Sequence, residues 1–232
     1  MKFPFARISS ILFLLIIIGF FSFSLYRKHK IRHIIEITLS GEHWKERMAE
    51  FTAQPRTQGH IVFLGNSLTE LFNLEILGDS TLINRGITGD FTEGMYSRID
   101  EVISLQPSRL FMEIGINDLV EHVPVKDVIR NYKATIERVK EKSPSTRIYI
   151  QSILPVRMED SWLTSTADVN EVVLEANEAL KKLATEEQAT YVDLHDNFYT
   201  NGAINPRLTW DGVHLVDEGY GIWKNLLQPY LH

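Results

Sequence analysis

Four polar stretches carry residue types that could together perform acyl transfer, and the first of them delivers a serine. Ser67 follows the apolar run 61–64 and Gly65, with Asn66 directly before it. A serine acts as a nucleophile when an adjacent base takes its proton. Serine and asparagine are also common caps at the start of a helix, so this stretch alone favours a cap and a nucleophile equally.

A second stretch, Asp211-Gly212-Val213-His214, supplies the acid and base that such a serine needs. An acid three residues before a histidine, with a glycine between them to bend the backbone, can accept a hydrogen bond from one imidazole nitrogen. The other nitrogen can then deprotonate Ser67 while the acid stabilises the imidazolium. The alternative for His214 is a packing or capping residue before the last helix.

Two further loops could stabilise the oxyanion of a tetrahedral intermediate. Gly86 lets a backbone N–H approach closely, and Asn117 offers its side-chain amide. The backbone N–H of Ser67 would be a third donor. Taken singly, Gly86 is typical of a turn and Asn117 of a loop cap, and it is their occurrence at successive strand ends that favours a catalytic site.

The elements that must position these residues alternate between short apolar runs and amphipathic stretches. The expected strands cover 61–64, 81–84, 109–114, 147–153 and 190–194. The expected helices cover 67–77, 93–105, 125–142, 168–188 and 216–230. This alternation predicts an α/β fold with a parallel sheet and helices on both faces. Because right-handed crossovers bring the carboxyl ends of parallel strands to one edge, the four polar stretches would face one crevice.

In this order, the four stretches resemble the signature blocks of the SGNH hydrolase superfamily, the GDSL-type esterases and lipases. The blocks are Gly65-Asn66-Ser67-Leu68-Thr69, Arg85-Gly86-Ile87-Thr88-Gly89, Gly115-Ile116-Asn117-Asp118 and Asp211-Gly212-Val213-His214. The resemblance covers residues 60–232 and is nearest to the branch of platelet-activating-factor acetylhydrolase catalytic subunits and bacterial acetylesterases acting on sugars. It implies a flavodoxin-like three-layer α/β/α sandwich with a mainly parallel sheet of five strands, which agrees with the alternation above.

The same resemblance implies roles for individual residues. Ser67 would be the nucleophile, and its N–H would join Gly86 and Asn117 in the oxyanion hole. His214 would act as general base and then as general acid, oriented by Asp211. No cofactor is implied, and we expect no metal, because the His-Asp pairs at 193–196 lack a metal-binding spacing.

The expected reaction is hydrolysis of an ester with a small acyl group, and acetyl is the acyl group that we favour. Carbohydrate esters are among the candidate substrates. The chain has no long insertion that could form an apolar lid over a fatty-acid groove. The candidate substrate-binding residues are Asn66, Arg85, Arg157, Trp162 and Trp210. Asn66 stands where the family more often has aspartate. The alternatives are a lysophospholipase or thioesterase of the same fold, and a catalytically silent, membrane-anchored carbohydrate-binding module.

The amino terminus is expected to contact a membrane. Residues 1–30 would form an anchor or a signal segment, because the stretch 11–21 is apolar apart from Gly19. Residues 31–58 would form a juxtamembrane connection and one helix, and residues 59–232 the hydrolase domain. We expect this domain to be exported to the periplasm or the extracellular side, although the basic residues after the segment favour the cytoplasm. Cleavage of the segment would make the protein secreted.

Composition narrows the partners further. The formal net charge of −6 offers no basic surface for nucleic acid. The absence of cysteine excludes disulfides and thiol catalysis. Neither the composition nor the four blocks indicate whether the protein is a monomer or an oligomer.

Overall fold

The computed structural model describes residues 5–54, 57–78, 81–158 and 166–231, with the side chains of 5–12 and 166–167 outside the description. The chain divides into two units after Ile37. Most of the first unit belongs to one helix, α1 (Phe5–Ser40), whose apolar side chains between Phe13 and Leu25 are largely exposed. Within the described residues, no helix combines the length and the hydropathy that crossing a bilayer requires. The anchor, its cleavage and its orientation stay predictions.

The second unit is built on a sheet of five parallel strands, as predicted. The strands are β1 (Ile61–Gly65), β2 (Leu82–Gly86), β3 (Arg109–Glu113), β4 (Arg147–Gln151) and β5 (Thr190–Val192). Their order in the sheet is β2-β1-β3-β4-β5. In this order β1 lies between β2 and β3, with Gly65 opposite both Gly86 and Glu113. The loops that carry three of the four polar stretches therefore leave adjacent strands at the same edge.

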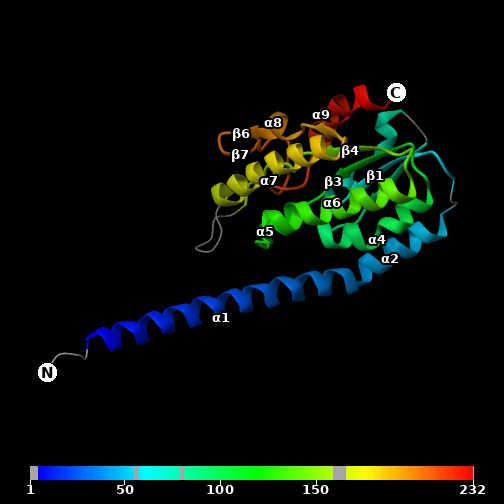
Figure 1. Ribbon diagram of the computed structural model, residues 1–232. Helices are drawn as coiled ribbons and strands as arrows, with labels where there is room; N and C mark the ends of the chain where they lie inside the picture. Colours follow the sequence, from blue (N-terminus) through cyan, green and yellow to red (C-terminus); the bar gives the residue numbers. More distant parts are fainter. Residues whose placement is uncertain (1–4, 55–56, 79–80, 159–165, 232) are drawn as a thin grey trace. The chain divides into compact units, whose positions relative to one another are not determined.

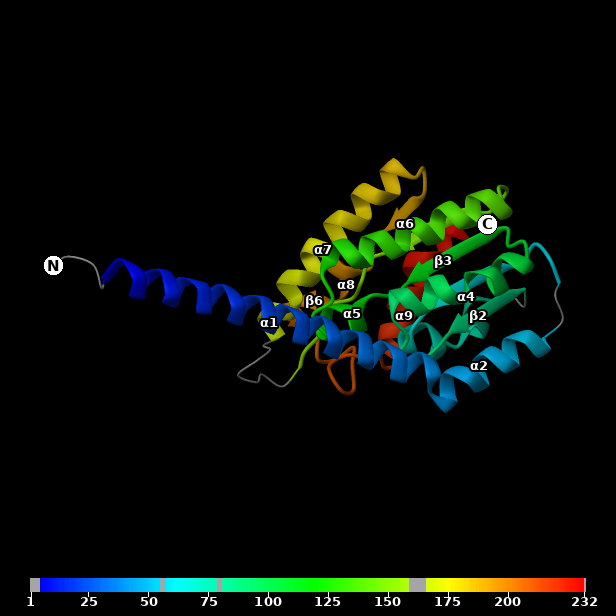
Figure 2. The same ribbon diagram turned by 60° about the horizontal axis from the view of Figure 1, so that its bottom comes forward.

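Helices cover both faces of this sheet, which confirms the three layers. On one face α4 (Thr92–Ser104), α6 (Val125–Lys142) and α7 (Thr166–Glu186) run side by side (Figures 1 and 2). On the other face α9 (Asp217–Leu227) packs against the odd-numbered residues of β1 and β3. Successive strand residues point to opposite faces, so strands buried on both sides are apolar at nearly every position.

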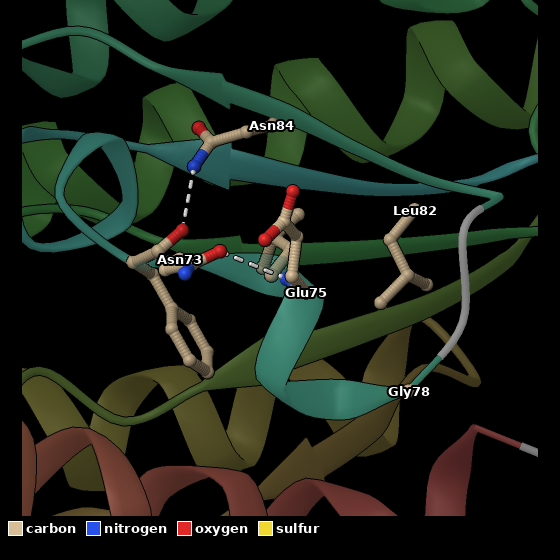
Figure 3. A pocket seen from close by; sticks show the side chains of 7 residues that line it. Asn73, Glu75, Gly78, Leu82 and Asn84 are labelled. Carbon is tan, nitrogen blue, oxygen red and sulfur yellow. Dashed lines mark hydrogen bonds between the residues drawn. The ribbon is translucent and has the colours of Figure 1, made fainter.

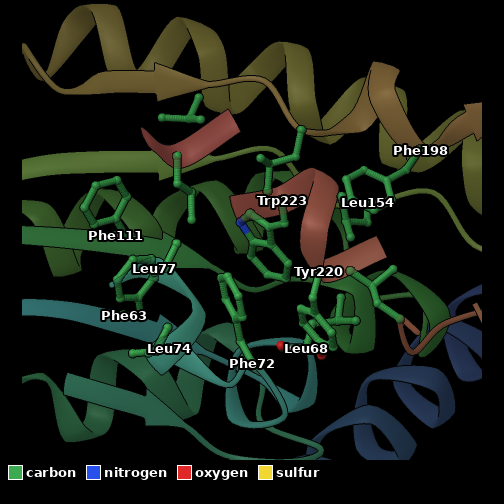
Figure 4. Packing of buried hydrophobic residues seen from close by; sticks show 14 of the residues in the cluster. Phe63, Leu68, Phe72, Leu74, Leu77, Phe111, Leu154, Phe198, Tyr220 and Trp223 are labelled. Atoms are coloured by element: carbon green, nitrogen blue, oxygen red, sulfur yellow. Dashed lines mark hydrogen bonds between the residues drawn. The ribbon is translucent and has the colours of Figure 1, made fainter. Parts of the chain in front are cut away.

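Stacked aromatic rings fill the space beneath α9 (Figure 4). Phe63 stacks on Phe111 with ring centroids 4.9 Å apart, and Phe72 stacks on Trp223 at 5.1 Å. The hydroxyl of Tyr220, on the same helix as Trp223, donates a hydrogen bond to the carbonyl of Leu68 at 3.0 Å. The last helix thus holds the residue next to Ser67 in place. Burial of large aromatic side chains dominates the stability of such a core.

Several short elements differ from the sequence prediction. The helix expected at 67–77 is two pieces, α3 (Ser67–Glu70) and the 3₁₀ helix η1 (Leu74–Leu77), because Asn73 caps the second piece by accepting a hydrogen bond from the Glu75 N–H. Within 31–58, where a connection and one helix were expected, α1 continues to Ser40 and α2 (Glu42–Ala53) follows it. The helix expected at 216–230 is α9 followed by the 3₁₀ helix η2 (Gln228–Tyr230). Four further short elements of the described chain were not predicted, namely α5 (Ile116–Val120), α8 (His195–Phe198), β6 (Tyr199–Thr200) and β7 (Ala203–Ile204).

Candidate active site

Ser67 lies in the turn between β1 and α3, at the edge of the sheet where the strands end. It is the first residue of α3 and is 5% exposed. Gly65 makes the turn possible, because a Cβ there would lie 2.1 Å from the Oγ1 of Thr69. The Oδ1 of Asn66 accepts a hydrogen bond from the Leu68 N–H at 2.9 Å and caps the helix. The cap is therefore Asn66, and the Ser67 hydroxyl is left for another contact.

That contact is with His214, whose imidazole connects Ser67 to Asp211. The Nε2 atom lies 3.0 Å from the Ser67 Oγ, and Nδ1 lies 2.6 Å from the Asp211 Oδ2. The other carboxylate oxygen accepts the backbone N–H groups of Val213 and His214. Burial raises the pKa of Asp211, but the hydrogen bonds with His214 and Val213 outweigh it and hold that pKa below its ordinary value. A carboxylate here fixes the tautomer in which Nε2 can accept the serine proton.

The loop that carries His214 is fixed by its own backbone. Gly212 has a φ of +91°, and a Cβ there would lie 1.7 Å from the Arg157 carbonyl oxygen. The Gly212 carbonyl accepts a hydrogen bond from the Arg157 N–H at 2.7 Å. The Oγ1 of Thr209 accepts the Gly212 N–H and donates to the His214 carbonyl. The hydrogen bonds of this loop therefore hold His214 in place.

Asn117 lies in α5, beside the end of the loop that follows β2. Its Nδ2 donates one hydrogen bond to the Asp90 carbonyl at 2.9 Å, which leaves the second N–H of that amide for an oxyanion. The next residue, Asp118, accepts hydrogen bonds from both the N–H and the hydroxyl of Thr92. Burial raises the pKa of Asp118 to about 7. These contacts hold α5 against the start of α4 and so orient the Asn117 amide.

The prediction that Gly86 donates to an oxyanion does not fit the structure. Its N–H already donates to the Oδ1 of Asn84 at 2.8 Å. A glycine is needed at position 86 for a different reason, because a Cβ there would lie 2.1 Å from the backbone nitrogen of Glu70. It is the last residue of β2, and its small size lets α3 pack directly against the strand.

Gly89 is the residue of this block that offers a free donor. It lies in the turn closed by the hydrogen bond from the Asp90 N–H to the Ile87 carbonyl at 3.1 Å, and its φ is +78°. Among the described residues the Gly89 N–H has no hydrogen-bond partner. Both glycines follow the predicted strand at 81–84. The observed strand β2 is longer and ends at Gly86, so that Gly89 is the glycine of the loop.

A buried ion pair joins the first two blocks. The Arg98 Nε lies 2.8 Å from the Asp90 Oδ2, and both side chains are almost fully buried. The same guanidinium donates to the carbonyls of Gly65 and Arg85, at the ends of β1 and β2. Removing either partner would leave a buried charge unpaired, which is strongly destabilising. This pair therefore fixes the spacing between the nucleophile turn and the loop that holds Gly89.

Two of the predicted substrate-binding residues are buried. Arg85 is 1% exposed, and its guanidinium bonds Glu101 and Gln54 and lies over the ring of Phe51. Asn66 is 0% exposed and caps α3 as described above. Both predictions conflict with this burial, and both side chains support the backbone of the site instead of lining it.

Other predicted substrate-binding residues lie at the surface. Trp210 is 67% exposed, and its ring stacks on the imidazole of His214 with centroids 5.4 Å apart. Arg157 is exposed and reaches the Ile204 carbonyl with one guanidinium nitrogen at 3.5 Å. Trp162 lies outside the described residues. Trp210 is thus an exposed aromatic side chain beside His214 that a substrate could contact.

A hollow beside η1 does not belong to this site (Figure 3). It is lined by Phe72, Asn73, Leu74, Glu75, Gly78, Leu82 and Asn84. Two of its polar side chains are already engaged, since the Asn84 Nδ2 donates to the Thr69 carbonyl at 2.6 Å and the Asn73 Oδ1 caps η1. The hollow contains none of Ser67, Asp211 and His214.

The sequence of this chain matches a known family over most of its length. The model of the GDSL-like Lipase/Acylhydrolase family matches residues 56–222. The chain belongs to this family. It is therefore an enzyme of the esterase and acylhydrolase class, and the GDSL-type resemblance inferred from the four blocks is confirmed.

This GDSL-like hydrolase is also similar to individual proteins, in sequence or in fold. It is 26% identical over 187 residues to the human platelet-activating factor acetylhydrolase IB subunit alpha1, an alignment that covers 76% of this chain and 78% of that protein. The structure of a GDSL-like lipase from Bacteroides thetaiotaomicron has a TM-score of 0.71 at 25% identity, covering 81% of this chain and 96% of that one. An acetylxylan esterase from Geobacillus stearothermophilus shares the fold, with a TM-score of 0.60 at 16% identity, over 75% of this chain and 94% of that one.

Proposed function

We propose that this GDSL-like hydrolase is a serine esterase that cleaves small acyl esters, acetyl esters in the first place, through an acyl-enzyme on Ser67. The observation that carries the proposal is the series of contacts from the Ser67 Oγ to the His214 Nε2 at 3.0 Å and from Nδ1 to Asp211 at 2.6 Å. A nucleophile, a base and an orienting acid in this arrangement perform acyl transfer on many unrelated folds.

The reaction follows from the roles that these atoms can take. The Ser67 Oγ attacks the ester carbonyl carbon while the His214 Nε2 takes its proton, and Asp211 stabilises the imidazolium. The oxyanion accepts hydrogen bonds from the Ser67 and Gly89 backbone N–H groups and from the Asn117 amide. The imidazolium then protonates the leaving alcohol. A water, deprotonated by His214, releases the acid and restores Ser67.

The preference for a short acyl group rests on two features. The chain carries no long insertion that could cover an acyl chain, and the human relative is named for acetyl hydrolysis. A carbohydrate alcohol is a candidate because Trp210 presents an exposed ring beside His214, and sugar rings stack on such surfaces. Lysophospholipase or thioesterase activity is the competing function of the same site.

A series of p-nitrophenyl esters from acetate to palmitate tests the acyl preference, followed by a panel of acetylated sugars. We expect kcat/KM to be highest for acetate and to fall as the chain lengthens. A rise with chain length would favour the lysophospholipase alternative. Labelling of the protein by a fluorophosphonate separates any esterase from a silent binding module, because only an activated serine reacts.

We further propose that the amino-terminal segment holds the enzyme at a membrane with the hydrolase domain exported. The apolar side chains exposed along α1 between Phe13 and Leu25 support this proposal. Fractionation of cells that express the full chain tests it. Recovery of the enzyme in the membrane fraction, with the domain open to external protease, is expected, whereas recovery of the intact chain in the cytosol would contradict it.

A further inference from the structure

Helix α2 precedes the segment that the family model matches, yet one of its side chains reaches the active-site loops. The guanidinium of Arg47 donates to the carbonyl of Gly86, with Nη2 at 3.2 Å and Nε at 3.4 Å. Gly86 ends β2, and the loop that carries Gly89 begins at the next residue. Arg47 therefore binds the backbone at the point where this loop leaves the sheet.

Glu70, at the end of the nucleophile helix α3, binds the same loop from a second side. Its Oε2 accepts the Thr88 N–H at 2.5 Å, and its Oε1 lies 3.4 Å from the Arg47 Nε. His43 of α2 approaches Oε2 at 3.0 Å. Burial raises the pKa of Glu70, but the hydrogen bonds from His43 and Thr88 and the Arg47 charge outweigh it and leave that pKa lowered. Glu70 is thus an anion that holds Thr88, the residue before Gly89, through a hydrogen bond from the Thr88 N–H.

The two contacts fix the loop on both sides of Ile87. Its N–H donates to the Gly65 carbonyl at 3.1 Å, and its carbonyl closes the turn by accepting the Asp90 N–H. Isolated surface ion pairs contribute little to stability, because water screens the charges and the ordering of two long side chains costs entropy. Here Arg47 and Glu70 are each less than one fifth exposed, and each binds a backbone group of the loop in addition to its ionic partners. The other ionic partner of Arg47 is Glu50 of the same helix, whose Oε2 accepts a hydrogen bond from Nη1 at 2.5 Å.

We propose that Arg47 and Glu70 are positioning residues that form a clamp holding the turn Ile87–Asp90, so that the Gly89 N–H faces the oxyanion. The inference rests on the proposed function, since it assigns a support to that oxyanion hole. A donor must be held within about half an ångström of its productive place, so a loosened turn would weaken the transition state more than substrate binding.

The test compares Arg47→Ala with Lys45→Ala, using p-nitrophenyl acetate. Lys45 is an exposed residue of the same helix, so its substitution removes the same charge without touching the loop. Loss of one oxyanion donor costs about 10²–10³-fold, and a displaced donor loses part of that. We expect kcat to fall about tenfold or more in Arg47→Ala with KM within about twofold, and Arg47→Lys to recover part of the loss. Lys45→Ala should match the wild type.

Two further measurements separate positioning from general destabilisation. The rate of fluorophosphonate labelling should fall together with kcat in Arg47→Ala, whereas the pH midpoint of kcat/KM should stay unchanged, because His214 and Asp211 are untouched. If Arg47→Ala fails to fold, Glu70→Gln decides, since it keeps the side-chain volume and removes the charge that binds Arg47. It should lower kcat severalfold at an unchanged KM.

Either folded variant with the kcat of Lys45→Ala would overturn the clamp. The result is distinguishable from failure of the proposed function. If the proposed function were wrong, the wild-type enzyme itself would neither hydrolyse p-nitrophenyl acetate nor react with the fluorophosphonate. An active wild type with an unaffected Arg47→Ala would reject the clamp alone.

Discussion

The described residues include two contacts between an aspartate and a histidine that are close in sequence, and the two pairs differ in what else the histidine contacts. Asp211 contacts His214, which reaches Ser67 with its other nitrogen. Asp196 lies 3.2 Å from the Nδ1 of His195, but the second nitrogen of that imidazole has no hydrogen-bond partner within the described residues. Among the described residues only the first pair reaches the hydroxyl of Ser67, the proposed nucleophile, and this difference makes the second pair a matched control.

Asp211→Asn should lower kcat on the order of a thousandfold, because an amide can no longer stabilise the imidazolium or fix its tautomer. Asp196→Asn makes the same chemical change on an exposed side chain that does not contact the triad, and it should leave kcat within about twofold of the wild type. Steady-state hydrolysis of p-nitrophenyl acetate measures both. Equal losses in the two variants would contradict the role of Asp211.

At this scale the sequence predicted the residues whose geometry is set by their own motif. Asp211 and His214 are three residues apart, and the glycine between them determines how they meet. Arg85 was predicted to face the substrate, but its partners Gln54 and Glu101 lie far away along the chain, and only the folded structure brings them together. Gly86 and Gly89 fit the same rule for a glycine after a strand, so the rule could not choose between them.

At the scale of elements, close packing of backbones sets the position of the nucleophile helix. α3 lies directly against the end of β2, which leaves no room for a side chain at Gly86. The parallel strands and long helices followed from their apolar periodicity, and the structure confirms them. The short elements α5, α8, β6 and β7 were not predicted because two to five residues are too few to show a period.

Gly86→Ala should therefore destabilise the domain by about 1–3 kcal/mol, the usual range for forced overpacking, and should lower activity by moving α3. Gly221→Ala is the control, because a Cβ at Gly221 in α9 meets no heavy atom within 4 Å. Alanine in a helix interior is neutral or stabilising. Denaturant unfolding of both variants gives the free energies, and an unchanged value for Gly86→Ala would show that α3 does not pack as described.

For the whole molecule, the least favourable buried group is an acid at the carboxyl end of the central strand β3. Glu113 is 0% exposed, and neither carboxylate oxygen has a partner among the described residues. Burial raises its pKa to about 8. In the unfolded chain the same group ionises near its ordinary value of 4.5. Folding therefore opposes ionisation of this group, and its contribution to stability falls as the pH rises from about 4.5 to about 8.

Glu113→Gln should remove this pH dependence. The free energy of unfolding of the variant, relative to that of the wild type, should rise between pH 5 and pH 8 by about 1 kcal/mol for each pH unit. Thermal or denaturant unfolding at both pH values measures the difference. Parallel pH profiles for the two proteins would mean that Glu113 does not carry the raised pKa.

Replacement of Ser67 distinguishes the nucleophile of an esterase from a serine that only begins helix α3. Turnover of p-nitrophenyl acetate by the wild type and by Ser67→Ala, each verified as folded by its thermal unfolding midpoint, is the decisive measurement. The triad contacts predict that Ser67→Ala loses at least about a thousandfold in kcat. A Ser67→Ala protein that hydrolyses the ester as fast as the wild type would rule out Ser67 as the nucleophile.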